Sequence, residues 1–389
     1  MRSSKEPIFK VVVLLFVLLS HSAWAESPRE PASVVPVAAE GARVVPAAVS
    51  DATKYEFQTY FDFGSQWDSA GGTSIGARSF GAKPGFMLLN AAELTVKATR
   101  GPLSARVDLA AGENVDVLTP FVASQNENLR YLTQAYLSYA IDEMPGWSVN
   151  AGKMYTHMGY ELTRSKDNWI YTRGLLFSYG IPFWHQGASL TGPIVDGALS
   201  GGLFVYNGWD GRTSADQNRS VTVGANLAMT SSATTVLTYN YIGGPEQADP
   251  SSRRDVHELI AGYNGSDFGL ILDAIAGQET GSTVAGKWQA YSLYSKVALS
   301  ERTRLVGRYE IFDDRDSGLA VAGALSATGA ARQYQSVTLG LNRDLSGGLE
   351  LRFEARQDIA DQSSTLFKDS SGASTSHQET FSLGLLFSL

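Results

Sequence analysis

The chain has 389 residues, no cysteine and a formal net charge of −8 at pH 7. No window holds eighteen consecutive apolar residues, which excludes a helical membrane protein, and the acidic balance argues against a nucleic-acid partner. A transmembrane β-barrel is apolar at only every second position of its strands, so a hydrophobic content of 43% does not exclude one.

The N-terminus has the three parts of a secretion signal. Three basic residues precede the apolar run of residues 11–19, which is too short to span a bilayer. Ala23-Trp24-Ala25 then matches a signal-peptidase cleavage site. The sequence therefore predicts a signal peptide over residues 1–25 and an exported protein, and the lack of cysteine is compatible with export.

Two further regions follow the signal. Residues 26–53 are rich in alanine, valine and proline and show no period, which predicts a flexible periplasmic linker. From residue 54 to residue 389, segments rich in valine, leucine, tyrosine and threonine alternate with clusters of glycine, aspartate, asparagine and serine. We expect residues 54–389 to form one β domain.

This domain contains seventeen candidate strands. They lie near residues 55–67, 87–99, 102–112, 130–141, 146–155, 170–180, 185–192, 197–207, 219–230, 233–243, 254–264, 267–276, 285–298, 302–313, 332–344, 348–360 and 378–389. Single-chain bacterial barrels have an even number of strands, so one assignment is wrong, and the first segment and 185–192 are the weakest. We predict an all-β fold, a transmembrane antiparallel β-barrel of about 16 strands, with 14 and 18 as open alternatives.

The segment from 349 to 359 shows the alternation most clearly. Its apolar positions are Leu349, Leu351, Phe353, Ala355 and Ile359, and its charged positions are Glu350, Arg352, Glu354, Arg356 and Asp358. Successive side chains of a strand point to opposite faces, so one face is apolar and the other charged. When this alternation recurs along a chain that begins with a secretion signal, it is typical of strands with lipid outside and water inside. The alternative is a large soluble β-sandwich or β-helix.

The connections between segments are expected to alternate in length. Residues 99–102 and 346–348 predict tight periplasmic turns. The longer polar stretches, expected to be extracellular loops, are 64–86, 112–129, 243–254, 314–331 and 361–377.

The last strand alternates up to the final residue. Phe381, Leu383, Leu385, Phe387 and Leu389 occupy every second position. This resembles the C-terminal signal by which the barrel-assembly machinery recognises outer-membrane barrels. In that pattern the final residue is usually aromatic, whereas here it is Leu389.

Charged rows are expected to face the lumen, because a charge on the lipid face at the midplane costs roughly 2–4 kcal/mol. The pore-lining candidates are Glu93, Lys97, Arg106, Asp108, Arg302, Arg304, Arg308, Glu310, Arg352, Glu354, Arg356 and Asp358. Either these charges pair and only line the wall, or they form a transverse field that filters solutes. In the second case, neutralising Arg304 and Arg352 together should shift ion selectivity toward cations.

Residues 156–169 show no strand alternation. They form either an ordinary surface loop, which is the commoner case, or a constriction segment folded into the barrel. The constriction candidates in this stretch are Glu161, Arg164, Lys166 and Asp167.

Several short motifs point to one family. They are Gly152-Lys153, Gly159 and Glu161, the run from Asn168 to Arg173, His185-Gln186-Gly187, and the run from Tyr206 to Asp210. Together they resemble the OmpL-like β-barrel porins of Gram-negative outer membranes, from about Tyr55 to the C-terminus. The resemblance implies a porin-type barrel with an aqueous pore, and no defined binding site.

No catalytic or metal-binding arrangement is visible. The four histidines after the signal segment are His157, His185, His257 and His377, and they lack the spacing of a zinc motif. The sequence has no G-x-S-x-G nucleophile elbow and no Gly-Lys-Ser/Thr phosphate loop. We predict that the protein is not an enzyme and uses neither a metal nor a cofactor.

Two functional hypotheses follow. The first is an outer-membrane porin whose water-filled channel passes ions or small hydrophilic solutes by diffusion. The second is a plugged or structural barrel that acts through its surface loops. The expected partners are outer-membrane lipid and lipopolysaccharide, the barrel-assembly machinery and small solutes. Trimers are common among general porins, although the sequence marks no subunit interface, so a homo-oligomer stays an open alternative.

Overall fold

The computed structural model describes residues 52–72, 74–118, 130–209, 218–230, 232–281, 285–314 and 333–389. The predicted signal peptide, and the predicted linker except for its last two residues, lie outside these ranges. Within them, no helix has the length and apolar character needed to cross a membrane.

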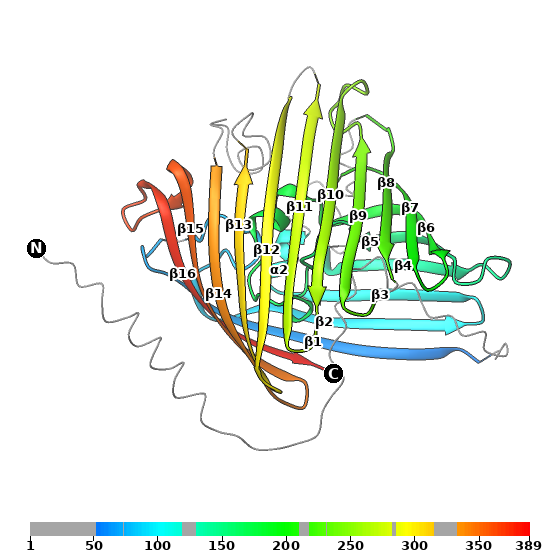
Figure 1. Ribbon diagram of the computed structural model, residues 1–389, viewed down its shortest axis with the longest axis horizontal. Helices are drawn as coiled ribbons and strands as arrows, with labels where there is room; N and C mark the ends of the chain where they lie inside the picture. Colours follow the sequence, from blue (N-terminus) through cyan, green and yellow to red (C-terminus); the bar gives the residue numbers. More distant parts are fainter. Residues whose placement is uncertain are drawn as a thin grey trace, which may run out of the picture. The chain divides into compact units, whose positions relative to one another are not determined.

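Sixteen antiparallel strands close into a barrel (Figure 1). Each strand pairs with its neighbours in sequence, and β1 pairs with β16 to close the cylinder. The strands are β1 (Lys54–Asp68), β2 (Gly85–Arg100), β3 (Leu103–Ala111), β4 (Leu132–Ala140), β5 (Ser148–Tyr155), β6 (Trp184–Val195), β7 (Leu199–Tyr206), β8 (Thr222–Met229), β9 (Thr235–Gly244), β10 (Arg253–Asn264), β11 (Phe268–Thr280), β12 (Gly286–Ser300), β13 (Thr303–Asp313), β14 (Gln333–Ser346), β15 (Leu349–Lys368) and β16 (Ser374–Ser388). The predicted strand number is therefore confirmed.

The alternation in the sequence becomes two faces of the barrel wall. On β14, Val337 and Leu339 project outward and are 50% and 51% exposed. Thr338, between them, and Ser336, which precedes Val337, are buried on the lumen side. The same alternation of exposed and buried positions runs along β11. An apolar exterior and a polar interior result, as a transmembrane barrel requires.

One predicted strand is wrong. Residues 170–180 form no strand but end in a π-helical turn, η5 (Leu176–Gly180), within the connection between β5 and β6. Their apolar residues are buried inside the barrel rather than facing lipid, for example Leu176 and Phe177. The two segments that the sequence marked as weakest are real strands, β1 and β6.

The barrel has short turns at one end and longer connections at the other. The predicted tight turns are confirmed, and Gly101, Gly347 and Gly348 supply the positive φ angles of 56°, 60° and 86° that these turns use. The loop predicted over 361–377 is too long, because β15 continues to Lys368 and β16 begins at Ser374. A short helix, α2 (Glu113–Leu118), opens the connection predicted over 112–129. The rest of that loop to residue 129, and residues 315–331 of another predicted loop, lie outside the described ranges.

Candidate functional site

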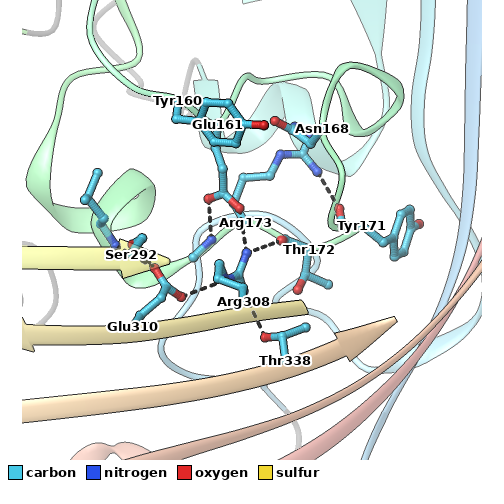
Figure 2. A network of polar contacts seen from close by, with 12 residues as sticks. Tyr160, Glu161, Asn168, Tyr171, Thr172, Arg173, Ser292, Arg308, Glu310 and Thr338 are labelled. Atoms are coloured by element: carbon cyan, nitrogen blue, oxygen red, sulfur yellow. Dashed lines mark hydrogen bonds and ion pairs between the residues drawn. The ribbon is translucent and has the colours of Figure 1, made fainter. Parts of the chain in front are cut away.

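The connection between β5 and β6 fills part of the lumen. We call residues 156–183 the insert; it contains a short 3-10 helix, η4 (Ser165–Asp167), and the turn η5. Its side chains are mostly buried, and many contact residues of the barrel wall (Figure 2). The stretch 156–169, for which a surface loop was the commoner expectation, thus lies inside the barrel together with the fourteen residues that follow it.

Arg308 of β13 contacts both a carboxylate and the backbone of the insert. Its Nη1 lies 2.6 Å from Oε1 of Glu161 and donates to the carbonyl oxygen of Thr172 at 2.7 Å (Figure 2). Its Nε lies 2.9 Å from Oε2 of Glu310 on the same strand. Burial raises the pKa of the Glu161 carboxyl, and the Arg308 guanidinium opposes this shift. A buried guanidinium therefore joins the wall to the insert between two carboxylates.

Two arginines of β15 bind backbone carbonyls of the insert. Arg352 donates through Nη1 to the carbonyl oxygens of Ser165 at 2.6 Å and Asn168 at 2.9 Å. Arg356 donates through Nη1 to the carbonyl oxygen of Arg173 at 2.7 Å, and its Nε donates to Asp358 at 2.8 Å. Charge-assisted hydrogen bonds of this kind are about twice as strong as neutral ones.

Acidic residues of the wall accept hydrogen bonds from the backbone N–H groups of the insert. Glu258 on β10 accepts from Gly159 at 2.8 Å, and Asp273 on β11 accepts from Tyr160 at 3.2 Å. Glu354 on β15 accepts from Thr172 at 2.9 Å. Irregular backbone buried at membrane depth must find hydrogen-bond partners, and these carboxylates supply them.

Arg173 organises the insert itself. It donates to the carbonyl oxygens of Leu162 at 3.0 Å and Tyr171 at 2.8 Å, and also to the carbonyl oxygen of Thr163. Its guanidinium lies 5.0 Å from the ring centre of Phe80, in the connection between β1 and β2. A single buried cation thus holds together parts of the insert that have no regular secondary structure.

The carboxylate of Asp62 on β1 accepts hydrogen bonds from two hydroxyl groups of the insert. Tyr171 donates to it at 2.8 Å and Ser165 at 2.6 Å. Gly64 and Gly384, which face each other across β1 and β16, leave the space for the Tyr171 side chain. A Cβ atom at Gly384 would lie 2.5 Å from that ring, so the glycine is required by close packing.

The insert also contacts the neighbouring strands β2 and β3. Arg164 lies 2.8 Å from Glu93 on β2 and 3.0 Å from Asp108 on β3. Lys166 and Asp167, which follow in η4, are 25% and 36% exposed and lie 4.0 Å apart. These two charges therefore stay in contact with water.

The strand register places eleven of the twelve pore-lining candidates on the lumen side of the wall. Those buried there are Glu93, Arg106, Asp108, Arg308, Glu310, Arg352, Glu354, Arg356 and Asp358. Lys97 and Arg304 are partly exposed, and Arg302 lies in the turn before β13. All four constriction candidates lie in the insert; their role in permeation stays a prediction.

Several residues of the site were not singled out from the sequence. Among them, Asp62 and Glu258 lie between other polar residues of β1 and β10, whereas Asp273 is a single acid within the apolar stretch 268–277. A lone carboxylate in an apolar strand is a signal for a buried partner, which here is the insert. Arg173 gave no such signal, because its partners are backbone carbonyls of its own segment.

In the described part of the chain, no three or more His, Asp or Glu side chains come together as metal ligands would. His157 lies 3.0 Å from the hydroxyl of Tyr206 and 3.0 Å from the carbonyl oxygen of Tyr241. These contacts attach the start of the insert to β7 and β9.

A closed barrel of sixteen strands, apolar outside and polar inside, with one connection folded into its lumen, is the architecture of a porin-like outer-membrane barrel. The sequence model of one family, described as "Putative beta-barrel porin-2, OmpL-like", matches residues 54–389. The chain therefore belongs to this family, as the resemblance of its motifs indicated. No curated protein sequence matches the chain.

Solved structures share the fold at low sequence identity. An anion-selective porin from Comamonas acidovorans is 12% identical, with a TM-score of 0.59, over 87% of this chain and 100% of that one. OmpF of Salmonella typhi, in complex with daunomycin, is 13% identical, with a TM-score of 0.58, over 87% of this chain and 98% of that one. OmpT of Vibrio cholerae with its loop L8 deleted is 13% identical, with a TM-score of 0.54, over 87% of this chain and 100% of that one.

Proposed function

We propose that the protein is a porin of the outer membrane, through which ions or small hydrophilic solutes diffuse passively. One observation carries this proposal: the insert does not cover the whole lumen wall. The lumen-facing side chains of Ser138 on β4 and Asn150 on β5 remain partly exposed to solvent. Arg304 on β13 and Asp344 on β14, also near the turn ends of their strands, are partly exposed as well. This exposure supports a water-filled entrance to the lumen at that end of the barrel.

Recordings in planar lipid bilayers test this function directly. The protein purified from outer membranes should insert as discrete conductance steps, and liposomes that contain it should swell in isotonic sugar. A barrel that yields neither conductance nor swelling is plugged, and the surface-acting alternative would then hold. Heat-denatured protein from the same preparation is the control for contaminating channels.

Export and assembly belong to the same proposal. Cleavage after Ala25 would leave Glu26 as the first residue, which mass spectrometry of the purified protein can establish. The alternating C-terminal strand would be read by the barrel-assembly machinery, and the apolar exterior would contact lipid and lipopolysaccharide. One similar structure, OmpT of Vibrio cholerae, is described in a trimer form. Sizing in mild detergent tests whether this chain also forms a homo-oligomer.

We infer further that the protein is not an enzyme and uses neither a metal nor a cofactor. Glu258 on β10 accepts from Gly159 of the insert, and His157 attaches the start of the insert to β7 and β9, so both side chains have structural contacts. Metal analysis of purified protein should find no stoichiometric metal.

A further inference from the structure

Two acidic side chains that bind the beginning of the insert lie next to each other. Glu258 on β10 and Asp273 on β11 come from adjacent strands, where Glu258 pairs with Ile275 and Ile260 pairs with Asp273. The two acids are 1% and 0% exposed, and their carboxyl groups lie within hydrogen-bonding distance of each other. Two ionised carboxylates so close together and away from water would repel each other strongly, so the pair needs a proton or a cation.

The cation is missing from the described surroundings of this pair. The guanidinium of Arg308 is engaged by two other carboxylates, at 2.6 Å from Glu161 and 2.9 Å from Glu310 (Figure 2). Among the residues that the structure describes, no basic side chain contributes to the electrostatic environment listed for Glu258 or forms an ion pair with Asp273. No third His, Asp or Glu side chain joins them there to form a set of metal ligands.

The other groups near the pair do not neutralise it either. Asn240 on β9 donates to Glu258 at 2.6 Å and carries no charge. Tyr160 in the insert and Tyr294 on β12 interact electrostatically with Asp273, and their hydroxyl groups are buried without a hydrogen-bond partner. Glu161 adds a further negative charge near Asp273. A proton is therefore the remaining means of neutralising one carboxylate.

The hydrogen bonds indicate which acid carries this proton. Both carboxylate oxygens of Glu258 accept from the N–H of Gly159, at 3.0 and 2.8 Å, and Oε2 also accepts from Asn240. Asp273 accepts only through Oδ2, from the N–H of Tyr160 at 3.2 Å, and its buried Oδ1 has no partner. A proton on Oδ1 would let Asp273 donate to Glu258, and this oxygen would no longer be an unpaired buried polar atom.

We propose that Asp273 is protonated at neutral pH and donates a hydrogen bond to ionised Glu258, and that this proton stabilises the attachment of the insert to β10 and β11. At alkaline pH its loss would leave two carboxylates repelling each other where they bind Gly159 and Tyr160, so the attachment would weaken. The inference goes beyond the porin function, because it concerns how the insert is held and applies equally to a plugged barrel.

Infrared spectroscopy of the folded protein tests the protonation directly. The C=O stretching band of a protonated carboxyl is separate from the bands of carboxylates and amides. The difference spectrum between wild type and Asp273→Asn at neutral pH should contain one such band, which should disappear reversibly at alkaline pH. Asp358→Asn is the matched control, because Asp358 is equally buried but lies 2.7 Å from Arg356 and should contribute no such band. A difference spectrum without this band for Asp273→Asn would overturn the proposal.

Two variants of unchanged shape test the position of the proton. In Asp273→Asn, the new amide can donate to Glu258 as the protonated carboxyl would, so the unfolding equilibrium constant should change little. In Glu258→Gln, an NH2 group replaces an oxygen that accepts from Gly159 or Asn240, so a buried donor loses its acceptor. The unfolding equilibrium constant should then rise about tenfold or more. Equal or reversed effects of the two substitutions would overturn the assignment of the proton to Asp273.

The pH dependence of stability is an independent measurement. Aspartate in an unfolded chain is ionised above about pH 5, so folding takes up one proton if Asp273 stays protonated. The unfolding equilibrium constant of wild type, divided by that of Asp273→Asn, should rise about tenfold for each pH unit from about pH 5 to neutral pH. A ratio that does not change with pH would overturn the proposal. The porin function is tested separately by conductance and swelling, on which neither the spectra nor the unfolding constants depend.

Discussion

The wall formed by β13–β15 and the wall formed by β4–β6 face the same lumen, yet they differ in charge, burial and partners. On the first, Arg308, Arg352 and Arg356 are nearly inaccessible to water, and each binds the insert. On the second, Ser138 and Asn150, near the turn between β4 and β5, stay partly exposed, and Asn150 bonds to Ser138 and Ser189 of the same wall.

The contacts of the first wall give its arginines a structural role. An irregular segment inside a barrel carries backbone N–H and C=O groups that must be paired, and charged side chains pair them most strongly. We infer that the charges of β13–β15 are concentrated there to hold the insert. Of the two interpretations of these charges that the sequence left open, the structural one agrees better with their contacts.

The largest expected effect is at Arg308. Arg308→Met would leave Glu161 and Glu310 buried without their cation, and breaking a buried pair in this way costs about 3–5 kcal/mol. The free energy of unfolding, measured by urea titration in lipid vesicles, should fall by that amount. Open-channel current noise should rise as the insert loosens.

The double variant Arg308→Met/Glu161→Gln serves as the control for Arg308. Removing one uncompensated carboxylate together with the cation should recover part of the lost stability. A single variant that unfolds like the wild type would mean that the insert does not depend on this ion pair.

A smaller effect is expected where the insert packs on β16. Gly384→Ala places a methyl group 2.5 Å from the ring of Tyr171, and overpacking of this kind costs about 1–3 kcal/mol. In Tyr171→Ala the same glycine substitution should cost much less, so the two changes should not add. Additive losses in the unfolding free energy would mean that Tyr171 does not occupy the space above Gly384.

The same comparison explains what the sequence could predict. Alternation gave the strands, their faces and the lumen position of residues such as Glu354, because period 2 follows from strand geometry alone. It failed at 170–180, because apolar residues packed inside a lumen look like those of a lipid-facing strand. The sequence also gave no indication of which wall the insert covers, since that depends on contacts between residues more than a hundred positions apart, such as Glu161 and Arg308.

The smallest expected effect is at Arg304, which matches Arg308 in residue type, strand and face. Arg304 lies 2.9 Å from Asp344 and 3.3 Å from Glu350, in partly exposed ion pairs. Because such pairs contribute about 0–1 kcal/mol, Arg304→Gln should change the unfolding free energy by no more than that. Its loss from a water-filled lumen should move the reversal potential slightly toward cations.

Arg352→Gln completes the comparison, because the sequence grouped Arg352 with Arg304 as residues that set selectivity. Arg352 is 3% exposed and donates to two carbonyl oxygens of the insert, so its substitution should lower stability and leave the reversal potential unchanged. If Arg352→Gln shifted the reversal potential as much as Arg304→Gln does, the charged wall of β13–β15 would lie in the path of permeating solutes. Arg304 and Arg352 would then both affect permeation, and the insert would not shield Arg352 from permeating ions.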